Sequence, residues 1–203
     1  MLAKSSKVMM LKRSKLLSLG VLISGRGSNL MAIQQHIKDG KLNAHIAIVI
    51  ANRPAAPGLA WAKQAQLPCI ELDTKQFANK AAYEAKLSEA LELAEIDLVV
   101  LAGYMAILGK AFVQKFRGRI INIHPSLLPD FKGLHAQKQA LDAGAKIAGC
   151  TVHYVDDGVD TGEIILQRTV PVLADDTEET LSERILKEEH QAYAQAIQLL
   201  IEK

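Results

Sequence analysis

Four continuous apolar runs, separated by segments with a helical pattern, limit the fold of this chain more than any other feature. The runs cover residues 16–24, 45–52, 97–103 and 119–124. Apolar residues fill each run without alternation, which is typical of strands that are buried on both faces. Helix-like segments lie between the runs, at residues 29–38, 58–66, 77–95 and 110–116. This βαβ series predicts an α/β fold with a mostly parallel central sheet and helices on both faces.

The pattern changes after residue 145. The stretch GCTVHYVDDGVDTGEIILQRTVPV (149–172) contains two β runs separated by a loop rich in Asp and Gly, which predicts a hairpin or an antiparallel addition to the sheet. A closing helix is expected over 177–202, because the Thr177-Glu178-Glu179-Thr180 start resembles a helix cap. No repeat or linker interrupts residues 16–203, so a single domain is expected there.

The first 15 residues, MLAKSSKVMMLKRSK, are basic and precede the first apolar run. Together with LLSLGVLIS they could be a signal peptide, but no small-residue cleavage pattern follows, and the run is too short to span a bilayer. We therefore expect a disordered basic leader before the first strand, and Met9 and Met10 leave the true start of the chain open.

Composition excludes some functions. The chain has 203 residues, of which 49% are hydrophobic, 23% charged and 4% aromatic, as in ordinary soluble enzymes. A net charge of +2 gives no general reason to expect a nucleic acid or a membrane as partner. Cys69 and Cys150 lie far apart without CxxC or metal-type spacing, which favours a reducing compartment, so a cytoplasmic location is expected.

Ligands of such sheets bind beyond the carboxyl ends of the strands, and the first strand ends in SGRGSN (24–29). Its two glycines permit a tight turn, and Ser28 and Asn29 are expected to cap a helix from Leu30 to Lys38. The amino terminus of a helix is an anion site. The motif is not GxGxxG, because Leu30 takes the last glycine position, and no Walker lysine follows. A phosphate or carboxylate site and a plain strand-to-helix turn both remain open.

A second strand end, AGYMAILG (102–109), carries the large apolar residues Tyr104, Met105, Ile107 and Leu108. These residues could line an apolar slot for a flat ring. Such residues are more often core, and taken alone the sequence favours core.

The third strand end is NIHPSLLP (122–129). Strand alternation places Asn122 and His124 on one side and Ile121 and Ile123 on the other. Two adjacent polar side chains on a buried strand are costly unless they are satisfied or used. A lone histidine is usually a hydrogen-bonded core residue, but the pair, followed by prolines that fix the departing loop, favours two donors aimed at a substrate oxygen.

A carboxylate would orient this imidazole and favour its protonated form. The loop VDDGVDTGE (155–163) offers four candidates, and the residues alone do not choose among them: Asp156, Asp157, Asp160 and Glu163. A metal loop is the alternative, but the spacing does not match an EF-hand, and no metal is expected. Without a GxSxG motif or a catalytic-type cysteine, we expect direct transfer with no covalent intermediate.

Five stretches together resemble the phosphoribosylglycinamide formyltransferase family, the folate-dependent enzymes of the third step of purine synthesis. They are VLISGRGSNL, LAGYMAIL, INIHPSLLPDFKGLHAQKQAL, GCTVHYVDDGVDTGEIILQ and KEEHQAY, and the resemblance runs from about Leu17 to Ile201. NIHPSLLP is shared by the wider formyltransferase superfamily, so it points to the donor chemistry. The resemblance implies a single-domain, Rossmann-like formyltransferase fold.

The resemblance also implies roles for individual residues. The catalytic residues would be Asn122, His124 and Asp160. The substrate glycinamide ribonucleotide would be bound by Gly27, Ser28, Asn29 and Glu189, the first three at its phosphate. The co-substrate 10-formyltetrahydrofolate would be bound by Lys80, Tyr104, Met105, Ala106, Ile107, Leu108, Asn122, Val155, Asp156, Asp157, Gly158, Val159 and Asp160.

In the implied reaction the amine of the ribonucleotide attacks the formyl carbon, and Asn122 and protonated His124 stabilise the oxygen that becomes negative. Proton transfer to the leaving folate nitrogen would use water or His124. Two positions depart from the family pattern: Ala106 stands where relatives can carry a basic residue, and Gln137 where a second histidine can follow His135. Partners are expected to be small molecules only, and the protein a monomer or homodimer.

Two alternatives stay open. A formyltetrahydrofolate hydrolase or a sister formyltransferase would share NIHPSLLP, although such proteins normally bring an added domain for which this chain has no room. A non-catalytic folate or nucleotide sensor would share the fold without turnover.

Overall fold

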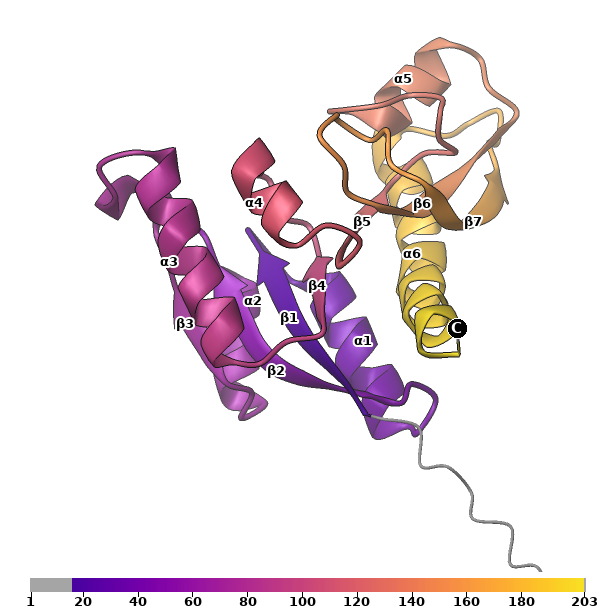
Figure 1. The fold of residues 1–203 in the computed structure, drawn as a ribbon. Coiled ribbons are helices and arrows are strands. Elements are labelled where there is room, and N and C mark those ends of the chain that lie inside the picture. The colour runs from indigo at the N-terminus through magenta and orange to yellow at the C-terminus, as the bar shows by residue number, and fades with distance from the viewer. Residues whose placement is uncertain (1–15, 203) are drawn as a thin grey trace, which may run out of the picture.

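The computed structural model describes residues 16–202, which fold around one seven-stranded sheet in the order β3-β2-β1-β4-β5-β6-β7 (Figure 1). The expectation of a disordered leader falls on residues 1–15, outside the described part. The strands are β1 Leu17–Ile23, β2 Ala44–Ala51, β3 Cys69–Glu71, β4 Leu98–Leu101, β5 Ile120–His124, β6 Ile147–Tyr154 and β7 Ile164–Pro171. The helices are α1 Ser28–Lys38, α2 Pro57–Gln64, the 3₁₀ turn η1 Thr74–Gln76, α3 Lys80–Leu93, α4 Lys110–Lys115, α5 Ala136–Asp142 and α6 Glu178–Ile201.

The strand directions confirm the predicted fold class. The first five strands pair in parallel, whereas β6 is antiparallel to both β5 and β7. Three elements were not predicted: β3, η1 and α5. Strand β3, at the sheet edge, has only three residues, too few to give an apolar run. Helix α5 has only seven residues and begins after His135, whose φ of 57° is left-handed.

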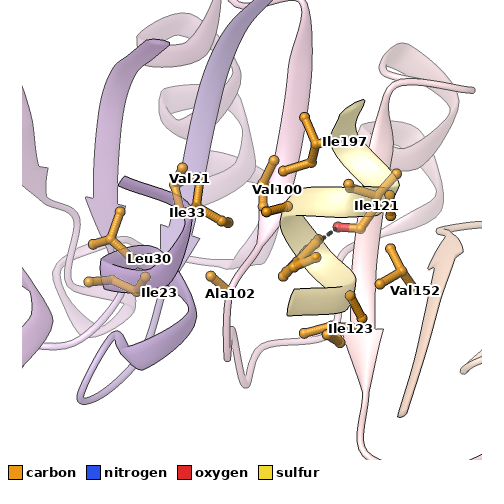
Figure 2. Close-up of a cluster of buried hydrophobic side chains, with 14 of the residues drawn as sticks. Val21, Ile23, Leu30, Ile33, Val100, Ala102, Ile121, Ile123, Val152 and Ile197 are labelled. Carbon is orange, nitrogen blue, oxygen red and sulfur yellow. Dashed lines mark hydrogen bonds between the residues drawn. The ribbon is translucent and has the colours of Figure 1, made fainter. Parts of the chain in front are cut away.

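Two hydrophobic clusters cover the two faces of the sheet, because successive side chains of the buried strands point to opposite faces. Val21 and Ile23 of β1 pack in the cluster formed with α1, α2 and α6, while Leu22 packs in the cluster formed with α3 and α4. Figure 2 shows part of the first cluster, with side chains from β1, α1, β4, β5, β6 and α6. No helix within residues 16–202 is long and apolar enough to cross a membrane.

Helix α6 is fixed to the sheet by a buried hydroxyl as well as by apolar packing. It packs against α1, β6 and β7, and the fully buried Tyr193 points its hydroxyl at two strands. That hydroxyl lies 2.9 Å from the Leu101 carbonyl oxygen and 3.1 Å from the Ile121 carbonyl oxygen. Tyr193 thus ties the helix to the last residue of β4 and to the first half of β5.

Replacing Tyr193 with Phe is expected to lower the free energy of unfolding by about 1–2 kcal/mol, because two buried carbonyl oxygens each lose a donor. Urea unfolding monitored by circular dichroism measures this change. Tyr154→Phe is the matched control, since the Tyr154 hydroxyl makes no hydrogen bond within residues 16–202. Equal stability of the two variants would contradict the assigned role of the hydroxyl.

Candidate active site

Most of the predicted site residues lie at the carboxyl edge of the sheet, in the loops that follow its strands or at the end of β5, whereas Lys80 and Glu189 come from α3 and α6. β1 lies between β2 and β4, so the chain leaves β1 toward β2 and later returns to its other side as β4. Ligands of open α/β sheets bind at such a reversal. β4 and β5 follow next in the sheet. Because neighbouring strands are about 4.8 Å apart, the ends of β1 and β5 lie roughly 10 Å apart.

The structure brings Asn122, His124 and Asp160 together. Asn122 and His124 lie on the same face of β5, as strand alternation predicts, and His124 is 5% exposed. The loop after β6 carries Asp160 to the imidazole, where its Oδ2 lies 3.3 Å from His124 Nδ1. Asp160 has a left-handed φ of 51°, and strained backbone of this kind is held at functional sites more often than elsewhere.

Of the four acidic residues left open by the sequence, Asp160 is the one in contact with His124. Asp156 bonds within its own loop, to the Gly158 N–H and the Thr161 hydroxyl. Asp157 and Glu163 are exposed. The sequence could not distinguish them because the choice depends on how the 155–163 loop turns back over β5.

The Asp160 carboxyl is set up to stay ionised. Burial alone would raise its pKa, but His153, the Gly133 N–H at 3.0 Å and His124 outweigh burial, so the pKa lies below its usual value. His124 Nε2 lies 2.9 Å from the Phe131 carbonyl oxygen, which can only accept a hydrogen bond, so Nε2 carries a proton. An ionised Asp160 also only accepts, so contacts on both ring nitrogens fit the protonated imidazole.

His153 is a site residue that the sequence analysis missed. It pairs with Asn122 across the antiparallel β5–β6 ladder and is 2% exposed. Its Nδ1 donates to the Tyr154 carbonyl oxygen at 2.8 Å, and its Nε2 lies 3.4 Å from Asn122 Nδ2 and 3.5 Å from Asp160 Oδ1. His153 therefore bridges the amide and the carboxylate. The available signal was the polar alternation of Thr151 and His153 in an otherwise apolar strand.

Thr151 holds the loop that follows His124. This fully buried residue of β6 pairs with His124 of β5, and its hydroxyl donates to the Ser126 carbonyl oxygen at 2.7 Å. The Thr151 hydroxyl oxygen in turn accepts from the Leu128 N–H at 3.0 Å and from Gln167 Nε2 at 2.9 Å. These bonds fix the PSLLP segment against β6 and β7.

The loop after β1 forms a cavity of about 240 Å³ that includes Gly27, Ser28 and Asn29. The expected cap is corrected here: α1 begins at Ser28, and the N-cap is Gly27, whose left-handed φ of 75° suits glycine. Ser28 and Asn29 lie in the first turn instead. The side-chain amide of Asn29 is turned toward α6, where its Nδ2 donates to Glu189 Oε2 at 2.8 Å. The structure thus joins all four residues predicted for the ribonucleotide.

Burial raises the pKa of Glu189, and the hydrogen bond from Asn29 only partly offsets this. Because the pKa of Glu189 is higher in the folded protein than in the unfolded chain, the protonated carboxyl stabilises the fold. This contribution is complete below pH 4.5, the ordinary pKa, and it is lost as the pH rises through the folded-state pKa. Each pKa unit corresponds to about 1.4 kcal/mol. Over this rise in pH, the free energy of unfolding of Glu189→Gln is expected to increase relative to that of the wild type.

Urea unfolding from pH 4 to pH 8 measures this difference, with Glu183→Gln on the exposed side of α6 as the control. Parallel curves for the wild type and Glu189→Gln would show that the buried carboxyl is not titrating as described.

Nine of the thirteen residues predicted to bind the folate line two cavities. Lys80, Tyr104, Ala106, Ile107 and Leu108 line one of about 250 Å³ beside α3. Residues 155–158 line another of about 600 Å³, together with α4 residues. One buried cluster supports both cavities. Ala106 and Leu108 of the first cavity and Val155 of the second pack against it. Val159 is exposed and lines neither cavity.

The 102–109 loop divides between core and surface. Tyr104 is buried and its hydroxyl lies 2.6 Å from that of Tyr83, so for this residue the core interpretation holds. Met105 and Ile107 are 62% and 73% exposed, which the core interpretation does not explain. Met105 lines the cavity beside Gly27, whereas Ile107 lines the cavity beside Lys80. Within residues 16–202 there is no cluster of three or more His, Cys, Asp or Glu residues that could hold a metal ion.

Comparisons with known proteins identify relatives of this chain. The sequence pattern of the formyl transferase family matches residues 18–197. The chain is 44% identical to the phosphoribosylglycinamide formyltransferase of Bacillus subtilis, over 89% of this chain and 93% of that protein. The solved glycinamide ribonucleotide transformylase 1 of Symbiobacterium toebii superposes with a TM-score of 0.90 at 48% identity, covering 92% of this chain and 88% of the other.

A longer relative is the trifunctional purine biosynthetic protein adenosine-3 of Drosophila melanogaster, which is 47% identical over 98% of this chain. The chain spans 15% of the length of that protein. Two of these relatives match over most of their own length as well as over most of this chain. The chain therefore belongs to the formyl transferase family and, within it, to the phosphoribosylglycinamide formyltransferases.

Proposed function

We propose that the protein transfers the formyl group of 10-formyltetrahydrofolate to the amine of glycinamide ribonucleotide, giving formylglycinamide ribonucleotide and tetrahydrofolate. The observation that carries the proposal is the contact of Asp160 with His124, beside Asn122, at the end of β5. The 102–108 loop adds support, because it contributes Met105 to the cavity beside Gly27 and Ile107 to the one beside Lys80. An acceptor and a donor can therefore approach from opposite sides of one loop.

In the proposed reaction the acceptor amine attacks the formyl carbon and a new carbon–nitrogen bond forms. The bond from that carbon to the folate nitrogen then breaks, and one proton passes from the amine to that nitrogen through water or His124. Asn122 Nδ2 and protonated His124 donate to the oxygen that becomes negative. One such donor is worth about 2.7–4 kcal/mol in the transition state.

Both donors have partners that the substrate oxygen must replace. The bond from Asn122 Nδ2 to His153 is long, at 3.4 Å, and is therefore easily released. His124 Nε2 is held more tightly, at 2.9 Å from the Phe131 carbonyl oxygen. Phe131 has a left-handed φ of 55°, so relaxation of its backbone would favour release of the imidazole N–H toward the substrate. Asp160 keeps the ring oriented during this exchange.

The folate fits the two cavities in chemical terms. A flat ring suits the apolar wall formed by Ala106, Leu108 and Val155. The Lys80 side chain is 54% exposed, and its ion pair with Glu84 is long, at 3.8 Å, so Lys80 is available to a carboxylate of the folate tail. Asp156 and Asp157 can accept hydrogen bonds from ring N–H groups. The predictions of a cytoplasmic location, of no metal, and of a monomer or homodimer belong to the same proposal.

Release of tetrahydrofolate from 10-formyltetrahydrofolate, followed with and without glycinamide ribonucleotide in buffer treated with chelator, tests the proposal. Turnover that requires the ribonucleotide and survives chelation is expected. Equal folate breakdown without the acceptor would instead identify a formyltetrahydrofolate hydrolase. Binding of both ligands without turnover would identify a sensor.

A further inference from the structure

The 104–109 loop, which leads from β4 to α4, is held at its start by two side chains from other elements. The Tyr104 hydroxyl lies 2.6 Å from the hydroxyl of Tyr83 on α3. The Met105 N–H donates to the hydroxyl oxygen of Ser24, directly after β1, at 2.8 Å. Ser24 is buried, so this bond is shielded from water. The first two residues of the loop are therefore fixed to both α3 and β1.

The far end of the loop is held by Glu84, the next residue of α3 after Tyr83. The Gly109 N–H donates to Glu84 Oε1 at 2.7 Å, and the Glu84 side chain is only 12% exposed. Gly109 is the N-cap of α4 and has no side chain with which to cap the helix. Glu84 thus fixes the point at which the loop ends and α4 begins.

Gly109 is fitted closely to this carboxylate. A Cβ at this position would lie 2.6 Å from Glu84 Oε2 and 3.2 Å from Oε1, too close for the carboxylate to stay in place. The backbone at Gly109, with φ −78° and ψ 155°, is ordinary extended backbone that any residue can adopt. The small residue is therefore needed for the approach of Glu84 and not for the backbone conformation.

Residues on both sides of Gly109 line the cavities proposed for the folate. Ile107 and Leu108 precede it and line the cavity of about 250 Å³. Val113, in α4, lines the cavity of about 600 Å³. Met105, at the start of the loop, lines the cavity proposed for the ribonucleotide instead. A change at Gly109 is therefore expected to reach the folate side first.

We infer that Glu84 is a positioning residue for the formyl donor, because it fixes Gly109 and with it the parts of the loop and of α4 that line the folate cavities. The inference rests on the proposed function for the identity of the donor. A hydrogen bond to a carboxylate is stronger than one between neutral groups, so its loss frees the loop end. Folate binding must then order this segment again, which lowers affinity. Asn122 and His124 keep their own partners, so the transfer step is not expected to change.

Steady-state kinetics of Glu84→Ala and Glu84→Gln test the inference. Alanine is expected to raise KM for 10-formyltetrahydrofolate about tenfold, with kcat and KM for the ribonucleotide nearly unchanged. Glutamine keeps an acceptor for the Gly109 N–H but loses the charge that faces Lys80, and it should recover most of the affinity. Glu89→Ala, which removes an exposed carboxylate from the same helix, is the control.

Gly109→Ala tests the same bond from its other partner. The added methyl group displaces the carboxylate, so this variant should show the same rise in KM for the folate as Glu84→Ala. In the double variant the two effects should not add, because both changes remove one bond. Full additivity would mean that the two residues act separately, which would overturn the inference.

Two measurements without turnover separate failure of this inference from failure of the proposed function. In Glu84→Ala the amide hydrogens of residues 106–113 should exchange faster than in the wild type, and calorimetry should show weaker binding of tetrahydrofolate. A wild type that binds tetrahydrofolate but transfers no formyl group would contradict the proposed function alone. Unchanged tetrahydrofolate affinity in Glu84→Ala, an equal rise in KM for both substrates, or a Glu84→Gln variant no better than Glu84→Ala would overturn the inference.

Discussion

Replacing His124 with Ala is expected to lower kcat by about 10²–10³-fold, because the developing negative oxygen loses one of its two donors. The His124 ring is held between Asp160 and the Phe131 carbonyl oxygen. We therefore expect it to act on the reaction step rather than on substrate binding. Dissociation constants for the ribonucleotide and the folate should stay within about threefold of the wild type. Steady-state kinetics and calorimetry on the same preparations measure both quantities.

His135→Ala is the matched control, since this histidine is largely exposed and lies 11 positions further along the chain. Because His124 is buried, its loss can also affect folding, so His124→Gln should be compared and thermal unfolding recorded for both. A His124 variant that is folded and retains a kcat within a few-fold of the wild type would remove this residue from the mechanism.

The second large effect is expected for Asp160→Asn, which should lower kcat by about 10²-fold. Asparagine keeps the size of the side chain and an acceptor for the Gly133 N–H, but it cannot supply the negative charge next to His124. The pKa of Asp160 is lowered, so the wild type retains the carboxylate throughout pH 5–8 and the deficit should persist across that range. A pH–rate profile of both proteins measures it.

The same lowered pKa has a consequence for stability. The ionised Asp160 stabilises the fold above its ordinary pKa of 3.8, and this contribution is lost as the pH falls through the lower folded-state pKa. Asp160→Asn should therefore show a weaker acid dependence of unfolding, whereas the exposed Asp175→Asn should behave like the wild type. Wild-type kcat for Asp160→Asn would contradict the role given to the carboxylate.

Much of the fold follows from short-range patterns. Continuous apolar runs such as HIAIVIAN indicate strands buried on both faces, and the helical segments between them require parallel crossovers. The alternation in INIH also puts Asn122 and His124 on one face, because the strand period is two. β3 and α5 were not predicted because at three and seven residues they depend on the surrounding structure rather than on their own pattern.

The parts of the site that sequence could not provide depend on contacts between distant segments. Asp160 reaches His124 only after the 155–163 loop folds back, and His153 meets Asn122 only through the register of β5 with β6. The cap of α1 was wrong because Gly27 adopts a left-handed conformation, which lets the helix begin at Ser28. Each case is decided by tertiary packing that local preference does not encode.

Tracing a ¹³C-labelled formyl group by mass spectrometry tests the central claim most directly. Labelled 10-formyltetrahydrofolate and glycinamide ribonucleotide would be incubated with the wild type, His124→Ala or Asp160→Asn. We predict that the wild type places the label on the glycinamide nitrogen and that both variants do so far more slowly while still binding both substrates. Label recovered only as free formate, or equally fast labelling by the variants, would contradict the account.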